Sequence, residues 1–517
     1  MTKHINRFKS YFCLLLLIIL FEAAFLLVLH STYTYGPAST HDSVAYMYAA
    51  KSLIKGNGLI YFGYETPFVQ WPPVYPFLLS LLSLAGDNLI TVAGYANAVI
   101  FAAVVFASGC WILNGTGSLL LSVGCSVAML VSIPLTYVSK YIWSEPLFIL
   151  SMLLFMILLE RNYGRFSIGC LIGSALLASL CALTRYIGVT SIITGCIMLL
   201  FTKRESFIQK IKEILIFGSI SSVPVAGWLI RNYILTKTLT GSRPPAQSNF
   251  WENVTAALKV MASWFGPEYS QLSVYIIMIL LLFFSIIACI ISGFTKEGSF
   301  SCYRISILLV SILVYFAYLV VSASVISFDN INSRLLSPVY VPFILMLFFA
   351  LNNIVGFFEG KAKKAVFSIL FILVFLIGLV YPMSQVRDDV RNSYENGSGI
   401  LASRWWTRSK TLEYIKELQT EDELYSNFPD AVYYYTGKRV CYTPKKEGPP
   451  EYGLEGFKEN IGDNTCTYIA WFNLETGDSI YHVEELAELF SIEEVEKFPD
   501  GTIYRIIGLR GSDNDNQ

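Results

Sequence analysis

Charged residues are scarce in this chain. Of its 517 residues, 15% are Asp, Glu, Lys or Arg and 54% are hydrophobic, whereas a soluble globular protein carries about 25% charged residues. Because so much apolar surface cannot be buried in one soluble core, the composition predicts a polytopic membrane protein. The formal net charge is −1. This lack of excess Lys and Arg argues against a nucleic-acid partner, whose phosphates require basic side chains.

Motifs that bind metals or form redox centres are also lacking. No CxxC pair occurs among the ten cysteines, which leaves little support for a zinc or redox site. Within apolar runs a Cys behaves as a small hydrophobic residue, and most of the cysteines lie in or beside such runs: Cys13, Cys110, Cys125, Cys170, Cys181, Cys196, Cys289 and Cys302. Only Cys441 and Cys466 fall in a polar region, where they form either a disulfide or two buried thiols.

Long apolar runs dominate the first three quarters of the chain. No small-residue cleavage site follows the first run, so we expect a retained span rather than a signal peptide. About 20 apolar residues cross a membrane, and this length predicts about eleven spans, at roughly 11–30, 88–112, 118–136, 143–160, 166–184, 186–202, 213–230, 272–294, 303–327, 336–357 and 365–383. Residues 74–85 are apolar but short, which is typical of a re-entrant or interfacial helix.

Basic residues indicate which side of the membrane each connection occupies. They gather on alternate connections, at Lys3, Arg7, Lys9, Arg161, Arg165, Lys203, Arg204, Lys210, Lys212, Lys361, Lys363 and Lys364. Because positive charge is retained on the cytoplasmic side, we expect a multi-pass cell-membrane protein with a cytoplasmic amino terminus. The first loop (31–87), the connection 231–271 and the region after 384 are then extracytoplasmic.

The C-terminal region differs in character from the rest. Charged residues become frequent, and TRSKTLEYIKELQ and VEELAELF have helical character, whereas RVCYTP, TCTYIAWF and TIYRIIG are typical of strands. We therefore predict an all-α membrane domain over 1–383 and an extracytoplasmic α/β domain over 384–517. The final GSDNDNQ is expected to be disordered.

The first extracytoplasmic loop holds an acid at the start of a predicted helix. Thr40 is a suitable N-cap, SVAYMYAAKSLIKG has helical character, and Gly56 and Gly58 end the pattern. Asp42 then falls in the first helical turn. On position alone, its charge complements the helix dipole. His41 beside it is either a spacer or a participant in the chemistry.

Several segments of the chain follow one another in a recognisable order. They are Asp42 with Tyr46 four residues later, KSLIKGNG, WPPVYP, YIWSEPLFILSMLLF, GCLIGSALLASLCALTRYIG, PVAGWLIRNY, FDNINSRLLSPVYVP and LYSNFPDAVYYYTG. In order and predicted side they resemble the GT-C membrane glycosyltransferases. The nearest group is the bacterial and archaeal branch related to dolichyl-phosphate-mannose protein mannosyltransferases and lipid A aminoarabinose transferases.

The resemblance implies roles for two acids. The catalytic acid of that family lies in the first outer loop, which corresponds to Asp42 here. A second acid in the next outer loop corresponds to Glu145, whose alternative role is a first-turn acid at the start of a span. The family often has Asp or a pair of acids there, whereas this chain has one Glu before a proline. This departure leaves dependence on a divalent metal open.

Three arginines lie at the predicted outer boundary of the membrane, where positive charge is disfavoured. They are Arg185, Arg231 and Arg334. The resemblance implies that they bind the phosphate of the donor, a task to which the planar guanidinium is suited; the alternative is snorkelling to lipid headgroups. Lys51 is a weaker phosphate-binding candidate. Tyr46 and Trp71 are substrate-binding candidates, although Trp71 also suits an interfacial aromatic belt.

The predicted function is transfer of a sugar from a polyprenyl-phosphate carrier to a protein, lipid or glycan of the cell envelope. Protein glycosylation is one such reaction. One alternative is a polysaccharide polymerase or ligase that uses diphosphate-linked glycans. Another is a transporter or flippase, although the sequence has no inverted repeat and few ionisable residues at mid-membrane depth. Glu22, in the first span, is either functional or a protonated acid bonded to a neighbouring helix. A receptor or scaffold would leave Asp42 and the outer arginines without a purpose.

Overall fold

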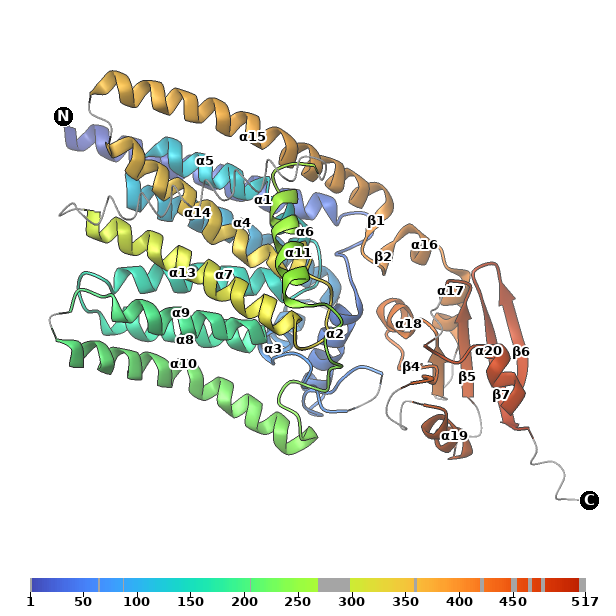
Figure 1. Cartoon of the computed structure of the whole chain (residues 1–517). Helices are drawn as coiled ribbons and strands as arrows, with labels where there is room; N and C mark the ends of the chain where they lie inside the picture. The colour runs from blue at the N-terminus through green and yellow to red at the C-terminus, as the bar shows by residue number, and fades with distance from the viewer. Residues whose placement is uncertain are drawn as a thin grey trace, which may run out of the picture. The chain divides into compact units, whose positions relative to one another are not determined.

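The chain is described here by a computed structural model, which divides it into two compact units. The described residues are 2–63, 66–86, 88–204, 206–267, 298–357, 360–418, 423–447, 453–463, 467–475 and 479–510. The first unit comprises Met1–Pro37 and Val69–Glu395, and the second comprises Ala38–Phe68 and Asn396–Gln517. The first is helical and the second contains a five-stranded sheet (Figure 1).

Helices form the first unit, and the long ones lie side by side (Figure 1). Their bounds are α1 Thr2–Ser31, α3 Val74–Leu82, α4 Leu89–Thr116, α5 Leu119–Leu130, α6 Ile133–Ser139, α7 Glu145–Arg161, α8 Ile168–Thr184, α9 Val189–Leu200, α10 Phe207–Thr236, α11 Phe250–Ser263, α13 Gly298–Ala323, α14 Ser333–Phe357 and α15 Lys361–Asn396. Two short 3₁₀ turns, Ser83–Ala85 and Tyr186–Gly188, follow α3 and α8.

Burial of these helices separates a core from a lipid-facing surface. In α14, 83% of the most apolar window is buried, against 17% in α10 and 11% in α15. Because the exposed side chains of α10 and α15 are mainly apolar, they suit contact with hydrocarbon rather than with water. Helix α14 therefore lies at the centre of the unit, where it packs against α4, α5, α6, α7, α11 and α13.

The predicted number of spans is not confirmed. Six described helices are long and apolar enough to cross a membrane, or seven if α5 and α6, bent by 54° at a short break, count as one span. Shorter helices cover most of the remaining predicted ranges. The span predicted at 272–294 lies outside the described residues. The short apolar segment at 74–85 forms α3 and the turn that follows it.

The second unit is built on a mixed sheet with the order β4-β3-β5-β7-β6. Its strands are β3 Glu423–Ser426, β4 Cys441–Tyr442, β5 Thr467–Phe472, β6 Phe490–Phe498 and β7 Gly501–Leu509. Strand β3 is parallel to β4 and β5, and β7 is antiparallel to β5 and β6. The small pair β1 Gly397–Ser398 and β2 Ala402–Ser403 precedes the sheet.

Helices of the second unit are short. They are α2 His41–Ile54, α16 Arg404–Thr407, α17 Lys410–Glu417, α18 Pro429–Thr436, α19 Leu454–Asp463 and α20 Val483–Leu489. The core of the sheet includes the buried side chains of Tyr425, Phe457, Ile469, Leu486 and Phe490. The predicted α/β character of the C-terminal region is thus present, with β4, β5, β7, α17 and α20 in the predicted segments. Cys466 and the final residues 511–517 lie outside the described part of the chain.

Helix α2, from the first loop, packs with α18 inside the second unit. It begins as predicted after Thr40, whose extended backbone (φ −133°, ψ −179°) is that of an N-cap, and whose N–H donates to the Ser43 hydroxyl at 3.1 Å. It ends at the predicted glycines: Gly56 has a φ of +82° and Gly58 of +79°, which glycine adopts without strain.

Candidate active-site residues

Glu145 is the first residue of α7 and is fully buried. Pro146 follows it, and a proline in the first turn suits a helix start because its fixed φ is already helical. The buried carboxylate lies at the positive end of the helix dipole, which favours its negative charge.

Two arginines from other helices hold the Glu145 carboxylate. Arg185, which follows the last residue of α8, forms an ion pair with Oε1 through its Nη1, and the same Nη1 donates to Ser144 Oγ at 3.2 Å. Arg334, the second residue of α14, places its Nε 2.5 Å from the same oxygen. Its guanidinium also lies 4.0 Å from the centre of the Trp143 ring, a cation–π contact. Three helices thus bring three predicted site residues together.

Two guanidinium groups in this cluster face one fully buried carboxylate. A second acid, Asp329, places Oδ2 3.7 Å from Arg334 Nη1, but its side chain is 65% exposed. Among the described residues, buried Glu145 Oε2 and Arg185 Nε have no hydrogen-bond partner. Since buried polar atoms are nearly always bonded, these two atoms mark a place where a further polar group would be stabilised.

Arg231 lies on α10, in a neighbouring polar group. Its guanidinium is 4.5 Å from the centre of the Trp228 ring, and its Nη1 donates to Asn232 Oδ1 at 3.0 Å. Asn232 Nδ2 and Trp228 Nε1 each donate to Tyr186 Oη at 3.1 Å. Because Tyr186 directly follows Arg185, this group lies at the same end of the helices as the Glu145 cluster.

Trp71 also belongs to the first unit and is partly buried. Beside it, Gln70 accepts a hydrogen bond at its backbone carbonyl from Arg243 at 3.1 Å. The Tyr186 hydroxyl donates a hydrogen bond to the backbone carbonyl of Val69 at 2.8 Å, in the same segment. The extended segment before α3 is therefore anchored to the end of the unit that holds the arginines.

Asp42, Tyr46 and Lys51 lie on α2 and belong to the second unit, so they are described within that unit. Asp42 is the second helical residue and is partly buried. Tyr46 is 1% exposed, and its ring centre is 6.4 Å from that of Phe68. Lys51 is exposed, with Nζ 5.1 Å from the centre of the Tyr433 ring. Of the three, Asp42 and Lys51 thus reach solvent within this unit, whereas Tyr46 is a core side chain.

His41 forms the most extensive polar contacts at the start of α2. Its Nδ1 lies 3.1 Å and 3.2 Å from the two oxygens of Asp430, and its Nε2 lies 2.7 Å from Tyr61 Oη. Tyr442 Oη lies 2.8 Å from Nδ1 and donates to Asp430 at 3.1 Å. The imidazole is thereby held by three side chains of its own unit.

The charges around His41 favour its protonated form. Burial lowers the pKa of the imidazole, but the hydrogen bond and charge of Asp430, helped by the charge of Asp42, outweigh burial and the opposing charge of Lys445. The pKa of His41 is therefore raised above its usual value. As an imidazolium, His41 donates one N–H to Asp430 and the other to Tyr61.

The surroundings of Glu145 do not fit a divalent cation, because two guanidinium groups already place positive charge against its carboxylate. Elsewhere in the described ranges, no three His, Cys, Asp or Glu side chains gather in a way that could hold a metal ion.

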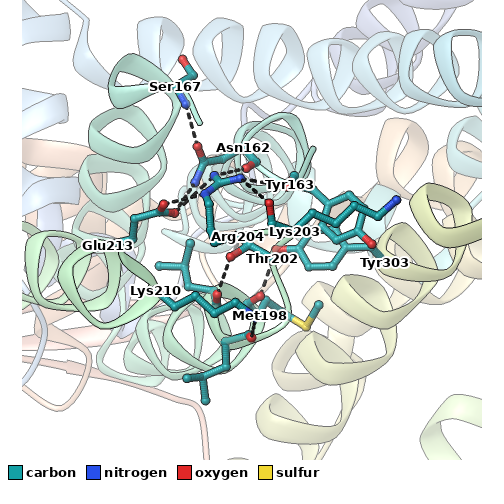
Figure 2. A network of polar contacts seen from close by, with 12 residues as sticks. Asn162, Tyr163, Ser167, Met198, Thr202, Lys203, Arg204, Lys210, Glu213 and Tyr303 are labelled. Atoms are coloured by element: carbon teal, nitrogen blue, oxygen red, sulfur yellow. Dashed lines mark hydrogen bonds and ion pairs between the residues drawn. The ribbon is translucent and has the colours of Figure 1, made fainter. Parts of the chain in front are cut away.

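A second charged cluster lies at the opposite end of α7 (Figure 2). Arg204 places Nε 2.6 Å from Glu213 Oε1, donates through Nη2 to the backbone carbonyl of Asn162 at 2.6 Å, and donates through Nη1 to that of Tyr163 at 3.1 Å. Figure 2 shows the Arg204 side chain between these partners. These bonds join the segment after α7 to Arg204 and to Glu213 of α10, which is the arrangement of a structural ion pair.

Several residues of these clusters were not predicted. Trp143 and Ser144 adjoin Glu145 within the segment YIWSEP, so their contacts with the arginines had a local signal. Lys140 had none: it is 2% exposed and places Nζ 2.6 Å from Asp389 Oδ2, which comes from α15. Asp430 lies in the tail segment LYSNFPDAVYYYTG, yet nothing local connects it to His41.

Solved structures provide the comparison with known proteins, since no family model and no curated protein matches the sequence. ArnT from Cupriavidus metallidurans in the apo state superimposes with a TM-score of 0.63 at 10% identity, over 94% of this chain and 97% of that chain. The same protein bound to undecaprenyl phosphate gives a TM-score of 0.60 at 11% identity, with the same coverage of both chains.

Two further structures extend the comparison. The archaeal oligosaccharyltransferase AglB from Archaeoglobus fulgidus, in complex with an inhibitory peptide and a dolichol-phosphate, gives a TM-score of 0.53 at 11% identity, over 90% of this chain and 70% of that chain. Arabinofuranosyltransferase AftD from Mycobacteria gives 0.58 at 14% identity, over 96% of this chain but only 40% of that one. The chain therefore shares its fold with these glycosyltransferases, which is the fold that the sequence resemblance implied.

Proposed function

We propose that this chain is an integral-membrane glycosyltransferase that moves a sugar from a polyprenyl-phosphate carrier to an acceptor on the extracytoplasmic face. The observation that carries the proposal is the fold shared with ArnT over nearly the full length of both chains, including a structure with undecaprenyl phosphate. The dolichol-phosphate in the AglB structure supports the same class of carrier. The acceptor is a hydroxyl of a protein, lipid or glycan.

The Glu145 cluster supports a phosphate-binding role for Arg185 and Arg334. The guanidinium groups of buried Arg334 and partly buried Arg185 share one carboxylate oxygen. Because Asp329, the second acid beside Arg334, is mostly exposed to solvent, part of their positive charge remains to attract an anion. When the sugar departs, the leaving phosphate gains charge, and cations fixed in place beforehand stabilise that transition state. Glu145 keeps the two arginines together without neutralising both. Arg231 is a further candidate for the same anion from the adjacent group.

Asp42 is proposed to handle the proton. The acceptor oxygen attacks the anomeric carbon, a new glycosidic C–O bond forms, and the C–O bond to phosphate breaks. The acceptor proton passes to the Asp42 carboxylate, and the carrier leaves as polyprenyl phosphate. A carboxylate within hydrogen-bond reach of the attacking hydroxyl is suited to this task, and the partial exposure of Asp42 at the start of α2 leaves it open to an acceptor.

The extracytoplasmic face follows from the distribution of basic residues in the sequence. Nucleotide sugars are as a rule lacking there, so a lipid-borne donor suits that face. The alternative of a polymerase or ligase differs in its product, because it would release polyprenyl diphosphate. A transporter or flippase would release none, because it makes and breaks no glycosidic bond.

The decisive experiment compares Asp42→Asn with the parent protein, purified in nanodiscs and supplied with a panel of polyprenyl-phosphate sugars. The substitution keeps the size and much of the capping ability of the residue but removes its charge. We expect kcat to fall about 10²–10⁴-fold, the usual contribution of a general base, with a stability change of at most about 1 kcal/mol. Release of polyprenyl phosphate and the sugar-bearing product are both measured.

A matched control is Glu413→Gln, which removes another first-turn acid of the same unit, on α17. It should lose the dipole contribution and an exposed ion pair with Lys410, which adds little stability, and it should transfer sugar at the parent rate. If Asp42→Asn is less stable but equally active per folded molecule, Asp42 is only a helix-start residue. A parallel assay supplies polyprenyl-diphosphate glycans in place of the monophosphate sugars, and release of polyprenyl diphosphate by the parent protein from these donors alone would favour the polymerase or ligase instead.

A further inference from the structure

A cluster of polar side chains ties the start of α2 to the C-terminal part of the second unit. His41 is the first residue of α2, Asp430 lies in the first turn of α18, and Tyr442 is the last residue of β4. Their polar atoms lie 2.8–3.2 Å apart. A fourth member, Tyr61, comes from the loop after α2 and closes the other side of the imidazole at 2.7 Å.

We propose that His41 is a positioning residue, which with Asp430 and Tyr442 fixes the orientation of Asp42 and so makes the C-terminal domain part of the catalytic apparatus. The inference rests on the proposed function, since it assigns a purpose to the residue beside the proposed base. It goes beyond the proposed function because it gives side chains of the C-terminal domain a role in orienting the proposed base.

The geometry explains how the contact would act on Asp42. Asp42 follows His41 directly in the chain, so the bonds that hold the His41 side chain also restrain the backbone of the first helical turn, which carries Asp42. Three side chains restrain the imidazole ring. Both oxygens of Asp430 and the Tyr442 hydroxyl lie near Nδ1, and the Tyr61 hydroxyl lies near Nε2. Misplacement of a catalytic group by about 1 Å can cost about 10²-fold in rate. An anchor at the adjacent residue is therefore worth a large effect on kcat.

The same contacts make the anchor dependent on pH. The charged groups facing His41 are Asp42 on its own helix, Asp430 on α18 and Lys445 after β4, while Tyr61 and Tyr442 face it as neutral hydroxyls. The raised pKa of His41 means that its ionic contact with Asp430 stabilises the folded state fully below the ordinary value near 6.5. That contribution is lost as pH rises through the folded-state pKa. Transfer should therefore decline on the alkaline side.

The test measures sugar transfer by the full chain in nanodiscs across a pH series, for the parent protein and for Asp430→Asn and Tyr442→Phe. Removing the Asp430 charge should move the alkaline decline to lower pH and reduce kcat about 10-fold or more, with little change in the KM for the donor. Tyr442→Phe removes a single hydroxyl and should cause a smaller loss in the same direction. Histidine NMR of His41 in each protein should show its pKa falling in Asp430→Asn.

The control is Asp500→Asn, which removes a carboxylate that accepts hydrogen bonds from the Ser409 hydroxyl and the Thr411 N–H in the same unit. It loosens the domain but should leave the pH profile in place. A parent-like kcat and an unmoved alkaline decline in Asp430→Asn would overturn the positioning role while leaving Asp42 as the base. Full activity of Asp42→Asn, measured in parallel, would remove the proposed base and the purpose of the anchor together.

Discussion

Each end of helix α7 carries a buried Glu paired with Arg, but the two carboxylates differ in how completely they are hydrogen-bonded. Glu145 begins the helix and Glu160 lies one residue from its end, and both are buried, at 0% and 5% exposure. Arg304 places Nε 2.5 Å from Glu160 Oε1, and the Trp111 Nε1–H donates to Oε2. Both oxygens of Glu160 are thus bonded. At Glu145 two arginines share Oε1 and, among the described residues, Oε2 has no partner.

The helix dipole makes this contrast informative. A carboxylate is stabilised at the start of a helix and destabilised at its end, so Glu160 needs Arg304 more than Glu145 needs a cation. Yet Glu145 has two. The number of bonds left unmade, rather than the type of residue, therefore distinguishes a candidate binding site from a structural ion pair.

The Glu160 end is closed further by a second ion pair. Arg204 binds Glu213 and caps the carbonyls of Asn162 and Tyr163, which follow the last turn of α7 (Figure 2). A cation at a helix C-terminus is favoured by the dipole. Within the described part of the chain, both oxygens of Glu160 and the carbonyls of Asn162 and Tyr163 are thus bonded to other groups of the protein.

Replacing Arg334 should have the largest effect on transfer. We expect Arg334→Ala to lower kcat about 10²–10³-fold, the usual cost of removing one group that stabilises developing charge. Arg334→Lys keeps the charge but loses the planar fork, so its rate should lie between those of the parent and Arg334→Ala. Transfer is measured at saturating donor on protein checked by thermal unfolding. Glu145 keeps Arg185 as a partner, so folding should survive.

The control for this series is Arg391→Lys, on an exposed surface of α15, which should behave as the parent. Parent-like rates in both Arg334 variants would show that Arg334 does not bind the phosphate. The contrast between the two ends of α7 would then have to be explained by packing alone.

Breaking the Glu160 pair should affect stability rather than chemistry. Glu160→Gln leaves the Arg304 charge buried without its carboxylate, which typically costs about 3–5 kcal/mol. The transfer rate per folded molecule should stay within about twofold of the parent, since most effects of such residues act through folding. The fraction of protein that stays folded in detergent and the midpoint of thermal unfolding both measure the stability. Restoration of stability by Glu160→Gln combined with Arg304→Met would support the structural reading, whereas a loss of rate in folded Glu160→Gln would refute it.

Labelling the two ends of α7 should leave transfer unchanged and place each end on one side of the membrane. Gln247→Cys marks the connection that lies with the Glu145 end, and Lys203→Cys marks the other; both side chains are exposed. Because basic residues gather on the cytoplasmic side, an impermeant thiol reagent should label Gln247→Cys on intact cells. Lys203→Cys should react only after the membrane is opened. Labelling above that of the parent is measured, and the reverse pattern would overturn the orientation.

Local signals in the sequence predicted much of the fold. Thr40, Gly56 and Gly58 fixed both ends of α2, because caps and left-handed glycines act within a few residues. Strands β5 and β7 were found from their apolar residues. Strand β6 was missed because SIEEVEKF has three Glu and one Lys among its eight residues and is mostly exposed. It lies at the edge of the sheet, where charged side chains are usual.

The candidate sites were less predictable because their contacts join distant parts of the chain. Glu145, Arg185 and Arg334 were named from the family resemblance and the side of the membrane, whereas Trp143 and Ser144 were not. That two arginines would share one carboxylate oxygen depends on how α7, α8 and α14 pack, which no short segment records. The contact of His41 with Asp430 spans 389 positions, and no periodicity or cap carries information over that distance.

The division of the second unit between residues 38–68 and the C-terminal region has a consequence for biosynthesis. At about 5–20 residues per second, the 389 positions between His41 and Asp430 take roughly 20–80 s to synthesise. The early segment must wait through the insertion of most of the membrane helices before its partner exists. A ribosome that stops early therefore leaves Asp42 on a helix without its α18 partner, so only a completed chain can assemble this unit.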